Sequence, residues 1–286
     1  MNDYSSDNNL DVTNPAPRCP VILMLDTSGS MDGDPLKELQ LGLDKFLQET
    51  SDDETASMSV ELEIITFGDD AEIVSPFAPV GDISDMPPKL TAAGMTPLGG
   101  ALKLADSELK ARRRLYKQKG IASYKPWIVL MTDGCPNDDY ESAAASMKRL
   151  GEEGKLQYIG IGIGEKADFD TLRKILPERP GPVKLKGLCF KEFFKWLTDS
   201  LKSVSASSVA EQDNVRLGNV TSWADLAGLP APVIVRAREI LENLENNAIA
   251  EEGQPSLAVG MAREKRGIYP RTKRPKTEAI QPSLFD

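Results

Sequence analysis

Histidine is absent from this 286-residue chain. Without an imidazole group, the chain cannot be a Ser-His-Asp hydrolase, an HExxH metalloprotease or an enzyme that uses histidine-bound zinc. Chemistry that relies on carboxylates, on lysine or on metal-bound water stays open.

Cysteine is scarce, since only Cys19, Cys135 and Cys189 occur and no CxxC spacing is present. This pattern favours reduced thiols in the cytosol over a disulfide framework or a zinc site. The polar, acidic residues 1–18 lack the apolar centre of a signal peptide, and no run approaches the ~18 apolar residues of a membrane span. We therefore expect a soluble, cytoplasmic protein that does not contact the membrane.

The charge is negative overall but unevenly distributed. A formal net charge of −10 argues against a general attraction to nucleic acid. Residues 263–276, however, contain seven lysines and arginines against one glutamate. This local basic stretch leaves a contact with nucleic acid or with an acidic surface open.

Several apolar segments predict strands. Residues 20–26, 127–131 and 156–164 are apolar without alternation, which is typical of strands buried on both faces. Residues 58–70 and 71–77 read as two strands joined at a Gly-Asp-Asp turn, which indicates an antiparallel pair.

Helical patterns lie between these strands, from residue 20 to about 204. Such alternation predicts a three-layer, doubly wound α/β fold with a mostly parallel sheet and one antiparallel edge strand. After residue 204 the sequence becomes rich in small, then in charged residues, which predicts a C-terminal helix and a disordered tail. The predicted organisation is a flexible arm (1–17), a folded domain (18–204), a linker (205–232), an amphipathic helix (233–250) and a disordered basic tail (251–286).

Short oxygen-bearing side chains follow the predicted strands. Asp26, Ser28 and Ser30 follow the first, Asp133 follows a later one, and Thr96 lies in a loop. The carboxyl ends of parallel strands share one edge of a sheet, where ligands bind in such folds. Hydroxyls with few carboxylates suit Mg²⁺, with Mn²⁺ as the alternative, and a partner's carboxylate could complete the ligand shell.

Simpler interpretations exist for each of these features. The D-x-S-x-S pattern alone can be a hydrogen-bonded turn. Thr96 is also a suitable N-cap, with Pro97 in the first helical position. Asp138 and Asp139 are expected in a solvated turn, with a place at the rim of the site as the alternative.

Three motifs together resemble a known site. D-T-S-G-S at 26–30, G-M-T-P-L-G around Thr96 and T-D-G at 132–134 are similar to the metal-ion-dependent adhesion site of von Willebrand factor A domains, over residues 18–204. The resemblance implies that Ser28, Ser30 and Thr96 bind the metal directly, and that Asp26 and Asp133 act through bound water. It also implies a module that binds an Asp or Glu of a protein partner.

Within this family, longer segments are similar to the bacterial tellurium-resistance-associated TerY type. These segments are LDTSGSMDGDPL, WIVLMTDGCPNDDY and FKEFFKWLTDSLKSVSASS. The resemblance implies a bacterial stress or defence system that includes a phosphatase and a kinase. The chain departs from this pattern after about residue 215.

Enzymatic alternatives are weaker. A Mg²⁺-dependent phosphotransferase of the haloacid-dehalogenase type needs an aspartate where Ser28 stands. GIGIGEK at 160–166 fails the dinucleotide pattern because Glu165 replaces the third glycine, and no P-loop or GxSxG motif occurs. We expect no enzymatic activity.

The C-terminal residues suggest a second class of function. QPSLFD resembles the bacterial sliding-clamp-binding peptide through Gln281, Leu284 and Phe285, and it follows the basic stretch. The chain could thus be a scaffold or DNA-associated adaptor that works through its tail. The 233–250 helix could dock on its own domain or in a partner's groove.

Overall fold

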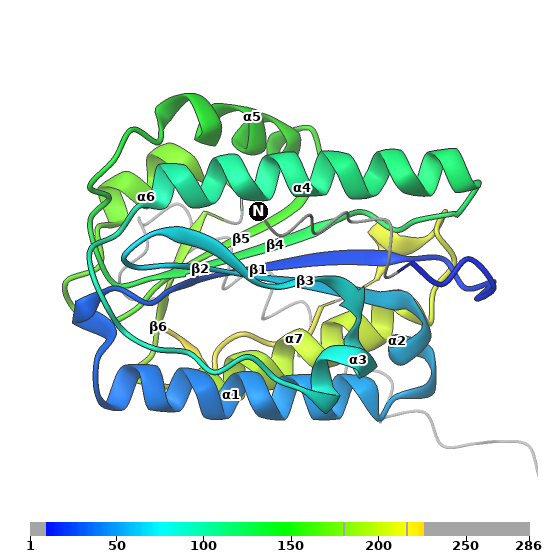
Figure 1. Cartoon of the computed structure of the whole chain (residues 1–286), viewed down its shortest axis with the longest axis horizontal. Coiled ribbons are helices and arrows are strands. Elements are labelled where there is room, and N and C mark those ends of the chain that lie inside the picture. The colour runs from blue at the N-terminus through cyan, green and yellow to red at the C-terminus, as the bar shows by residue number, and fades with distance from the viewer. Residues whose placement is uncertain (1–9, 180, 216, 226–286) are drawn as a thin grey trace, which may run out of the picture. The chain divides into compact units, whose positions relative to one another are not determined.

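The computed structural model describes residues 10–179, 181–215 and 217–225 of the chain. A seven-stranded sheet, in the order β3-β2-β1-β4-β5-β6-β7, lies between two layers of helices (Figure 1). The strands are β1 (Cys19–Asp26), β2 (Val60–Phe67), β3 (Ala71–Pro79), β4 (Trp127–Thr132), β5 (Gln157–Gly162), β6 (Pro182–Leu185) and β7 (Ala224–Asp225). The α-helices are α1 (Asp34–Ser51), α2 (Glu54–Ser59), α3 (Val80–Asp85), α4 (Leu98–Lys119), α5 (Glu141–Glu152), α6 (Phe169–Ile175) and α7 (Phe190–Ser205).

The sheet is parallel in its centre and antiparallel at both edges. Strands β2, β1, β4, β5 and β6 run parallel, whereas β3 pairs antiparallel with β2. The predicted fold class is therefore confirmed. A second antiparallel edge strand, β7, pairs with β6 and was not predicted.

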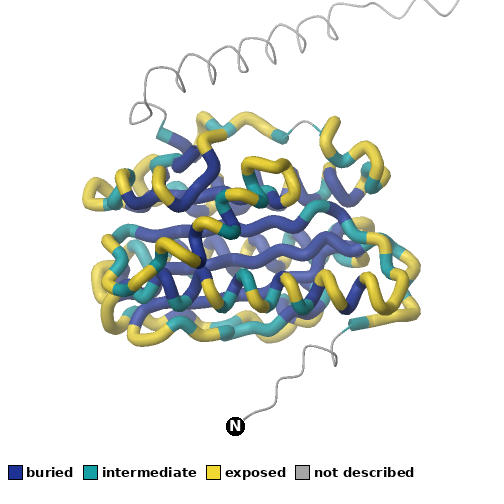
Figure 2. The backbone as a smooth tube through the Cα atoms, turned by 90° about the horizontal axis from the view of Figure 1, so that it is seen from above, coloured by how far each residue is buried: buried dark blue, intermediate teal, exposed yellow. Residues whose placement is uncertain are grey.

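Helices cover both faces of the sheet, which explains the apolar strands. α1, α3 and α7 pack on one face and α4, α5 and α6 on the other (Figure 1). All residues of β1, β2 and β4 are buried, and the exposed residues gather in the surrounding helices and loops (Figure 2). Strands buried on both sides need no polar face, so the apolar runs are continuous.

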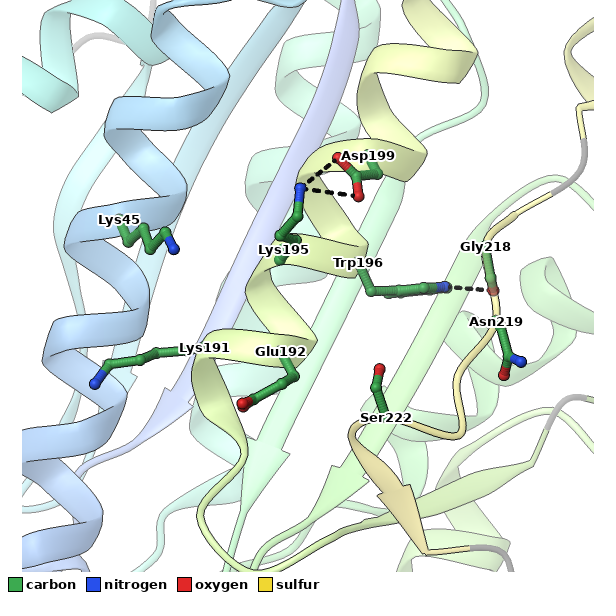
Figure 3. A pocket seen from close by; sticks show the side chains of 9 residues that line it. All are labelled: Lys45, Lys191, Glu192, Lys195, Trp196, Asp199, Gly218, Asn219 and Ser222. Atoms are coloured by element: carbon green, nitrogen blue, oxygen red, sulfur yellow. Dashed lines mark hydrogen bonds and ion pairs between the residues drawn. The ribbon is translucent and has the colours of Figure 1, made fainter.

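The face covered by α1 and α7 carries an aromatic cluster. The ring centroids of Phe46 and Phe194 lie 5.5 Å apart, and Phe193 contacts Trp223 edge-on at 5.0 Å. Trp196 lies 5.3 Å from Trp223 and donates a hydrogen bond of 2.8 Å from its indole nitrogen to the Gly218 carbonyl (Figure 3).

Part of the predicted linker therefore belongs to the folded domain. Trp223 is 1% exposed, and Leu217 and Val220 also pack against the core. Apolar burial of this kind holds residues 217–225 against α7, although the small residues before them predicted a linker from residue 205. Residues 226–232, the predicted helix at 233–250 and the predicted tail at 251–286 lie outside the described residues.

The face covered by α4 contains a buried ion network, made of Arg18, Glu61, Arg112 and Tyr116. Glu61 accepts hydrogen bonds from the side chains of Arg18 at 3.2 Å and Arg112 at 2.8 Å. The Tyr116 hydroxyl donates to the same carboxylate. All four side chains are almost fully buried, and they join the first residues of β2 to the C-terminal half of α4.

Glu63, two residues along β2, is buried without such support. Within the described part of the chain, its Oε1 atom has no hydrogen-bond partner. Burial raises the pKa of Glu63 to about 8, and the nearby Glu108 carboxylate adds to the rise. Within the residues that the structure describes, no helix combines the length and apolar character needed to cross a bilayer.

Candidate metal centre

The predicted site residues meet at the edge of the sheet where the carboxyl ends of β1 and β4 lie side by side. The strand order reverses here, because β2 and β3 follow on one side of β1 and β4 to β6 follow on the other. Such a switch point leaves a crevice between the connecting loops, where ligands of open α/β sheets bind. Asp26 is the last residue of β1, and Asp133 follows the last residue of β4.

Asp26 is held firmly inside this edge. One carboxylate oxygen accepts the backbone N–H of Ser28 at 2.9 Å, and the other accepts the hydroxyl of Thr132. Burial raises the pKa of Asp26, the hydrogen bonds from Ser28 and Thr132 oppose this, and the Asp133 carboxylate adds to the rise. A nearby cation would offset this cost, since it favours the ionised form.

Two serines connect Asp26 to Asp133. The hydroxyl oxygens of Ser28 and Ser30 lie 3.0 Å apart, and Ser30 donates a hydrogen bond of 2.8 Å to Asp133. Ser28 is buried and Ser30 is exposed, so the row of oxygens runs from the interior to the surface. The structure thus brings together four of the five predicted residues through direct hydrogen bonds.

Thr96, the fifth residue, approaches the same group from the loop before α4. A Cβ atom on Gly134 would lie 3.0 Å from the Thr96 hydroxyl oxygen, so a side chain there would crowd that oxygen. The Thr96 carbonyl also accepts the backbone N–H of Asn137 at 3.1 Å. The loops that carry Thr96 and Asp133 are therefore packed against each other.

The prediction that Thr96 caps a helix is wrong. Helix α4 begins at Leu98, and Pro97 takes the cap position with no side-chain hydrogen bond of its own. Instead, the carboxylate of Asp138 accepts the backbone N–H groups of Gly99 at 2.7 Å and Gly100 at 2.8 Å. A carboxylate at this end also suits the helix dipole. The Thr96 hydroxyl is therefore not used as a cap.

Backbone hydrogen bonds fix the loop that carries Thr96. Ala93 donates to the Thr27 carbonyl at 2.8 Å, and Gly29 donates to the Gly94 carbonyl at 3.1 Å. Gly94 has a φ of +69°, and a Cβ there would come within 2.3 Å of Asp69. Only glycine suits this position, because a side chain would clash with Asp69 and the φ is left-handed.

The donor set fits a hard divalent cation. Within the described residues, neither Asp26 nor Asp133 takes part in an ion pair, and no three Asp, Glu or Cys side chains are grouped to hold a metal. An ion here would depend on hydroxyl oxygens and water, which suits Mg²⁺ or Mn²⁺ better than zinc or copper.

Sequence reasoning missed two supporting residues. Thr132 orients the Asp26 carboxylate, and its place in the T-D-G motif was the available signal. Asp138 holds the start of α4 from 39 residues away, and no local pattern indicates such a contact.

A comparison with protein families finds a match over more than half of the chain. The family model described as von Willebrand factor type A domain matches residues 21–187. That range contains all five residues of the candidate metal centre.

Solved structures share the fold. The von Willebrand factor type A protein from Catenulispora acidiphila is 21% identical, with a TM-score of 0.50, and the match covers 66% of this chain and 43% of that one. Proximal thread matrix protein 1 from the mussel byssus, solved with a zinc-occupied MIDAS motif, is 19% identical over 65% of this chain and 48% of that one. The TM-score of this match is 0.46.

A short stretch is similar to a different kind of protein. Over 40 residues the chain is 60% identical to the DNA mismatch repair protein MutS of Anaeromyxobacter sp. (strain K). This match covers 14% of the chain and 4% of MutS. The chain therefore spans only a small part of that relative.

Proposed function

The chain belongs to the von Willebrand factor type A domain family, and from this premise we propose that it is a non-catalytic module that binds a protein partner through a divalent cation. The continuous row of oxygen atoms through Ser28, Ser30 and Asp133 carries the proposal. These groups converge at the switch point of the sheet, and among the described residues Asp133 forms no ion pair.

In this proposal the five residues have two different roles in metal binding. Ser28, Ser30 and Thr96 hold the ion directly, whereas Asp26 and Asp133 orient bound water. A site with so few carboxylates leaves the cation short of negative charge, so it attracts an Asp or Glu of the partner. Mg²⁺ is the proposed ion and Mn²⁺ the alternative, because both favour oxygen ligands.

Catalysis has little support at this edge. Ser28 occupies the position where a phosphotransferase of the dehalogenase type needs a proton-transferring aspartate. Asp26 and Ser28 are buried and their groups are occupied by hydrogen bonds to neighbouring residues. Both features support capture of a ligand over its chemical conversion.

We further propose a biological setting of the TerY type. The similarity of the segments at 25–36, 127–140 and 190–208 supports it. The chain would then act in the cytoplasm of a bacterium, in a stress or defence system, with a phosphatase and a kinase among its partners.

Metal binding is tested directly by isothermal titration with Mg²⁺ and Mn²⁺. The variant Ser28→Ala/Ser30→Ala should lose metal binding and keep its fold, because only two hydroxyl oxygens are removed. Ser107→Ala/Ser203→Ala is a matched control, since both hydroxyls bond only their own helix backbone, in α4 and α7. Unchanged metal binding by the first variant would refute the site.

Partner binding is tested by affinity capture from the host's lysate in Mg²⁺ and in chelator. A partner lost in chelator and with Ser28→Ala/Ser30→Ala, but kept by the control, supports metal-mediated capture. A partner kept under both conditions and lost only on deletion of residues 226–286 would assign the function to the C-terminal part.

The similarity to MutS favours a second candidate, an adaptor that works near DNA. In this proposal Gln281, Leu284 and Phe285, which lie outside the described residues, bind a bacterial sliding clamp. Leu284→Ala/Phe285→Ala should abolish binding to the immobilised clamp, whereas Ser283→Ala at a variable position should not. Equal binding by both variants would exclude this peptide.

A further inference from the structure

Helix α4 presents a row of positive charge to solvent. Lys103, Lys110, Arg113, Arg114 and Lys117 are all exposed, and we call them the basic stripe. Counted from Lys110, the others lie at −7, +3, +4 and +7, which places all five on one face of a helix. The opposite face of α4, with Ala105 and Leu109 among others, packs on the sheet. The stripe therefore points away from the core.

Most of these charges are not neutralised by the protein. Lys110 pairs with Asp106 at 2.5 Å, but the other four have no ion pair among the residues that the structure describes. Neighbouring like charges on a helix destabilise it by a few tenths of a kcal/mol per pair. The positive row is thus maintained in a chain whose net charge is −10, and a negatively charged partner would relieve the repulsion.

Lysines elsewhere on the surface behave differently. On α7, Lys191 pairs with Glu38 at 3.3 Å and Lys195 pairs with Asp199 at 3.2 Å. Lys45 on α1 pairs with Glu49 at 3.4 Å. These three lysines line a hollow beside residues 218–222, where Figure 3 shows Lys195 directed at Asp199. Each of these lysines has an acidic partner that compensates its charge. They therefore serve as a control for the unpaired cations of the basic stripe.

The stripe ends in a shallow hollow suited to an anion. This hollow, of about 510 Å³, is lined by Arg113, Arg114, Tyr116, Lys117, Ile121 and Ser123. Two guanidinium groups can each present paired N–H donors, which match the oxygen atoms of a phosphate. The Ser123 hydroxyl adds a neutral donor to the same wall.

We propose that the basic stripe binds the phosphate backbone of a nucleic acid. An acidic protein surface fits less well, because the centre of a protein interface needs apolar anchors. None of the large, exposed hydrophobic side chains in the described residues lies on α4. From Lys103 to Lys117 the helix rises by 14 steps, about 21 Å, which suits a regular polyanion. Contacts of this kind position a nucleic acid without reading its sequence.

This surface is separate from the metal centre and does not depend on it. The stripe begins at Lys103, the sixth residue of α4, and four of its five cations lie in the C-terminal half, whereas Thr96 and Asp138 lie at the start of the helix. A chain without a functional metal centre, such as Ser28→Ala/Ser30→Ala, should therefore bind nucleic acid as the natural chain does.

The test is fluorescence anisotropy of labelled single-stranded and duplex DNA with the full chain, between 50 and 200 mM salt. Arg113→Gln/Arg114→Gln/Lys117→Gln should weaken binding at least tenfold. It should also lower the slope of log affinity against log salt by about 2 to 3, because each phosphate contact contributes about 0.7 to 0.9. The matched control, Lys45→Gln/Lys191→Gln/Lys195→Gln, removes the same charge and should change affinity less than twofold.

Several results would overturn the proposal. One is the absence of DNA binding at 50 mM salt, and another is an equal loss in both variants, which would reflect net charge alone. Residues 263–276 are unchanged in both, so binding through them alone would leave the stripe variant unaffected. A stripe variant that keeps DNA binding but loses binding to a polyglutamate peptide would assign the surface to acidic proteins instead. Unchanged circular dichroism and melting temperatures check the fold.

Discussion

On the face of the sheet covered by α1 and α7, packing is almost entirely apolar, and rings from Phe46, Phe193, Phe194 and Trp223 contact one another. On the face covered by α4, the buried carboxylate of Glu61 is surrounded by two guanidinium groups and a phenol. Both faces have an apolar core made of non-directional contacts, but the α4 face adds a buried network of hydrogen bonds with fixed geometry.

The two kinds of contact contribute differently to the stability of the fold and to the placement of the helices on the sheet. Aromatic packing supplies most of its energy through buried area, and it accepts small shifts of one helix over another. A buried ion pair contributes little net stability but tolerates almost no displacement, because each charge must keep its partner. The ion network therefore fixes how α4 sits on β2. The loop that contains Thr96 leads directly into the start of α4. The contacts that fix α4 therefore also help to position Thr96 in the candidate metal centre.

The largest effect is expected from breaking the ion network. Glu61→Ala should lower the free energy of unfolding by about 3–5 kcal/mol, because it leaves two guanidinium groups buried without their carboxylate. Urea denaturation measures this change. Glu72→Ala on the exposed part of β3 should stay within about 0.5 kcal/mol. A loss below about 1 kcal/mol for Glu61→Ala would mean that the buried arginines find other partners.

A slightly smaller effect is expected on the aromatic face. Trp223→Ala should cost about 3 kcal/mol, because it removes a fully buried ring from contact with Phe193 and Trp196. Val12→Ala, at a position that is 58% exposed, is the control in the same denaturation experiment. If residues 205–225 were a loose linker, as their composition predicted, both variants would have the same free energy of unfolding as the natural chain.

The smallest effect is expected on the pH dependence of stability, and it comes from Glu63 on the α4 face. Glu63 has its pKa raised to about 8 by burial and by Glu108, so the folded chain holds a proton that the unfolded chain releases near pH 4.5. The stability that Glu63 contributes is complete below pH 4.5 and is lost as the pH rises through about 8.

Between pH 6 and pH 7.5 the free energy of unfolding should therefore fall by about 2 kcal/mol, because each pH unit between the two pKa values corresponds to about 1.4 kcal/mol. Glu63→Gln should remove this slope, and Glu72→Gln should leave it intact. Parallel pH profiles for the natural chain and Glu63→Gln would show that the buried carboxyl is already ionised at pH 6.

The sheet and the convergence of most candidate site residues could be predicted from the sequence because their signals are local. Strands such as β1 are buried on both faces and therefore read as continuous apolar runs. Asp168 directly precedes α6 and caps it by accepting the backbone N–H of Thr171, which is a local signal of the same kind. Asp26, Ser28 and Ser30 lie within five residues, and the parallel order of β1 and β4 brings Asp133 to the same edge.

The remaining features depend on contacts that no short window contains. Asp138 takes over the cap expected of Thr96 from a loop that follows another strand. Glu61 and Glu63 alternate with apolar residues, a pattern typical of a half-exposed strand, but both are buried, Glu61 beside Arg112 and Glu63 near Glu108 of α4. Trp223 follows a polar, Gly-containing stretch, and only the pairing of β7 with β6 makes it part of the core.

The length of α4 has a consequence for how one chain could serve two ligands. Its 22 residues form a rod of about 33 Å, with the oxygen-rich edge at its first turn and the arginine pair near its last. A protein captured at one end and a nucleic acid bound at the other would be tethered without touching. The second encounter would then become intramolecular, at an effective concentration that can reach the millimolar range.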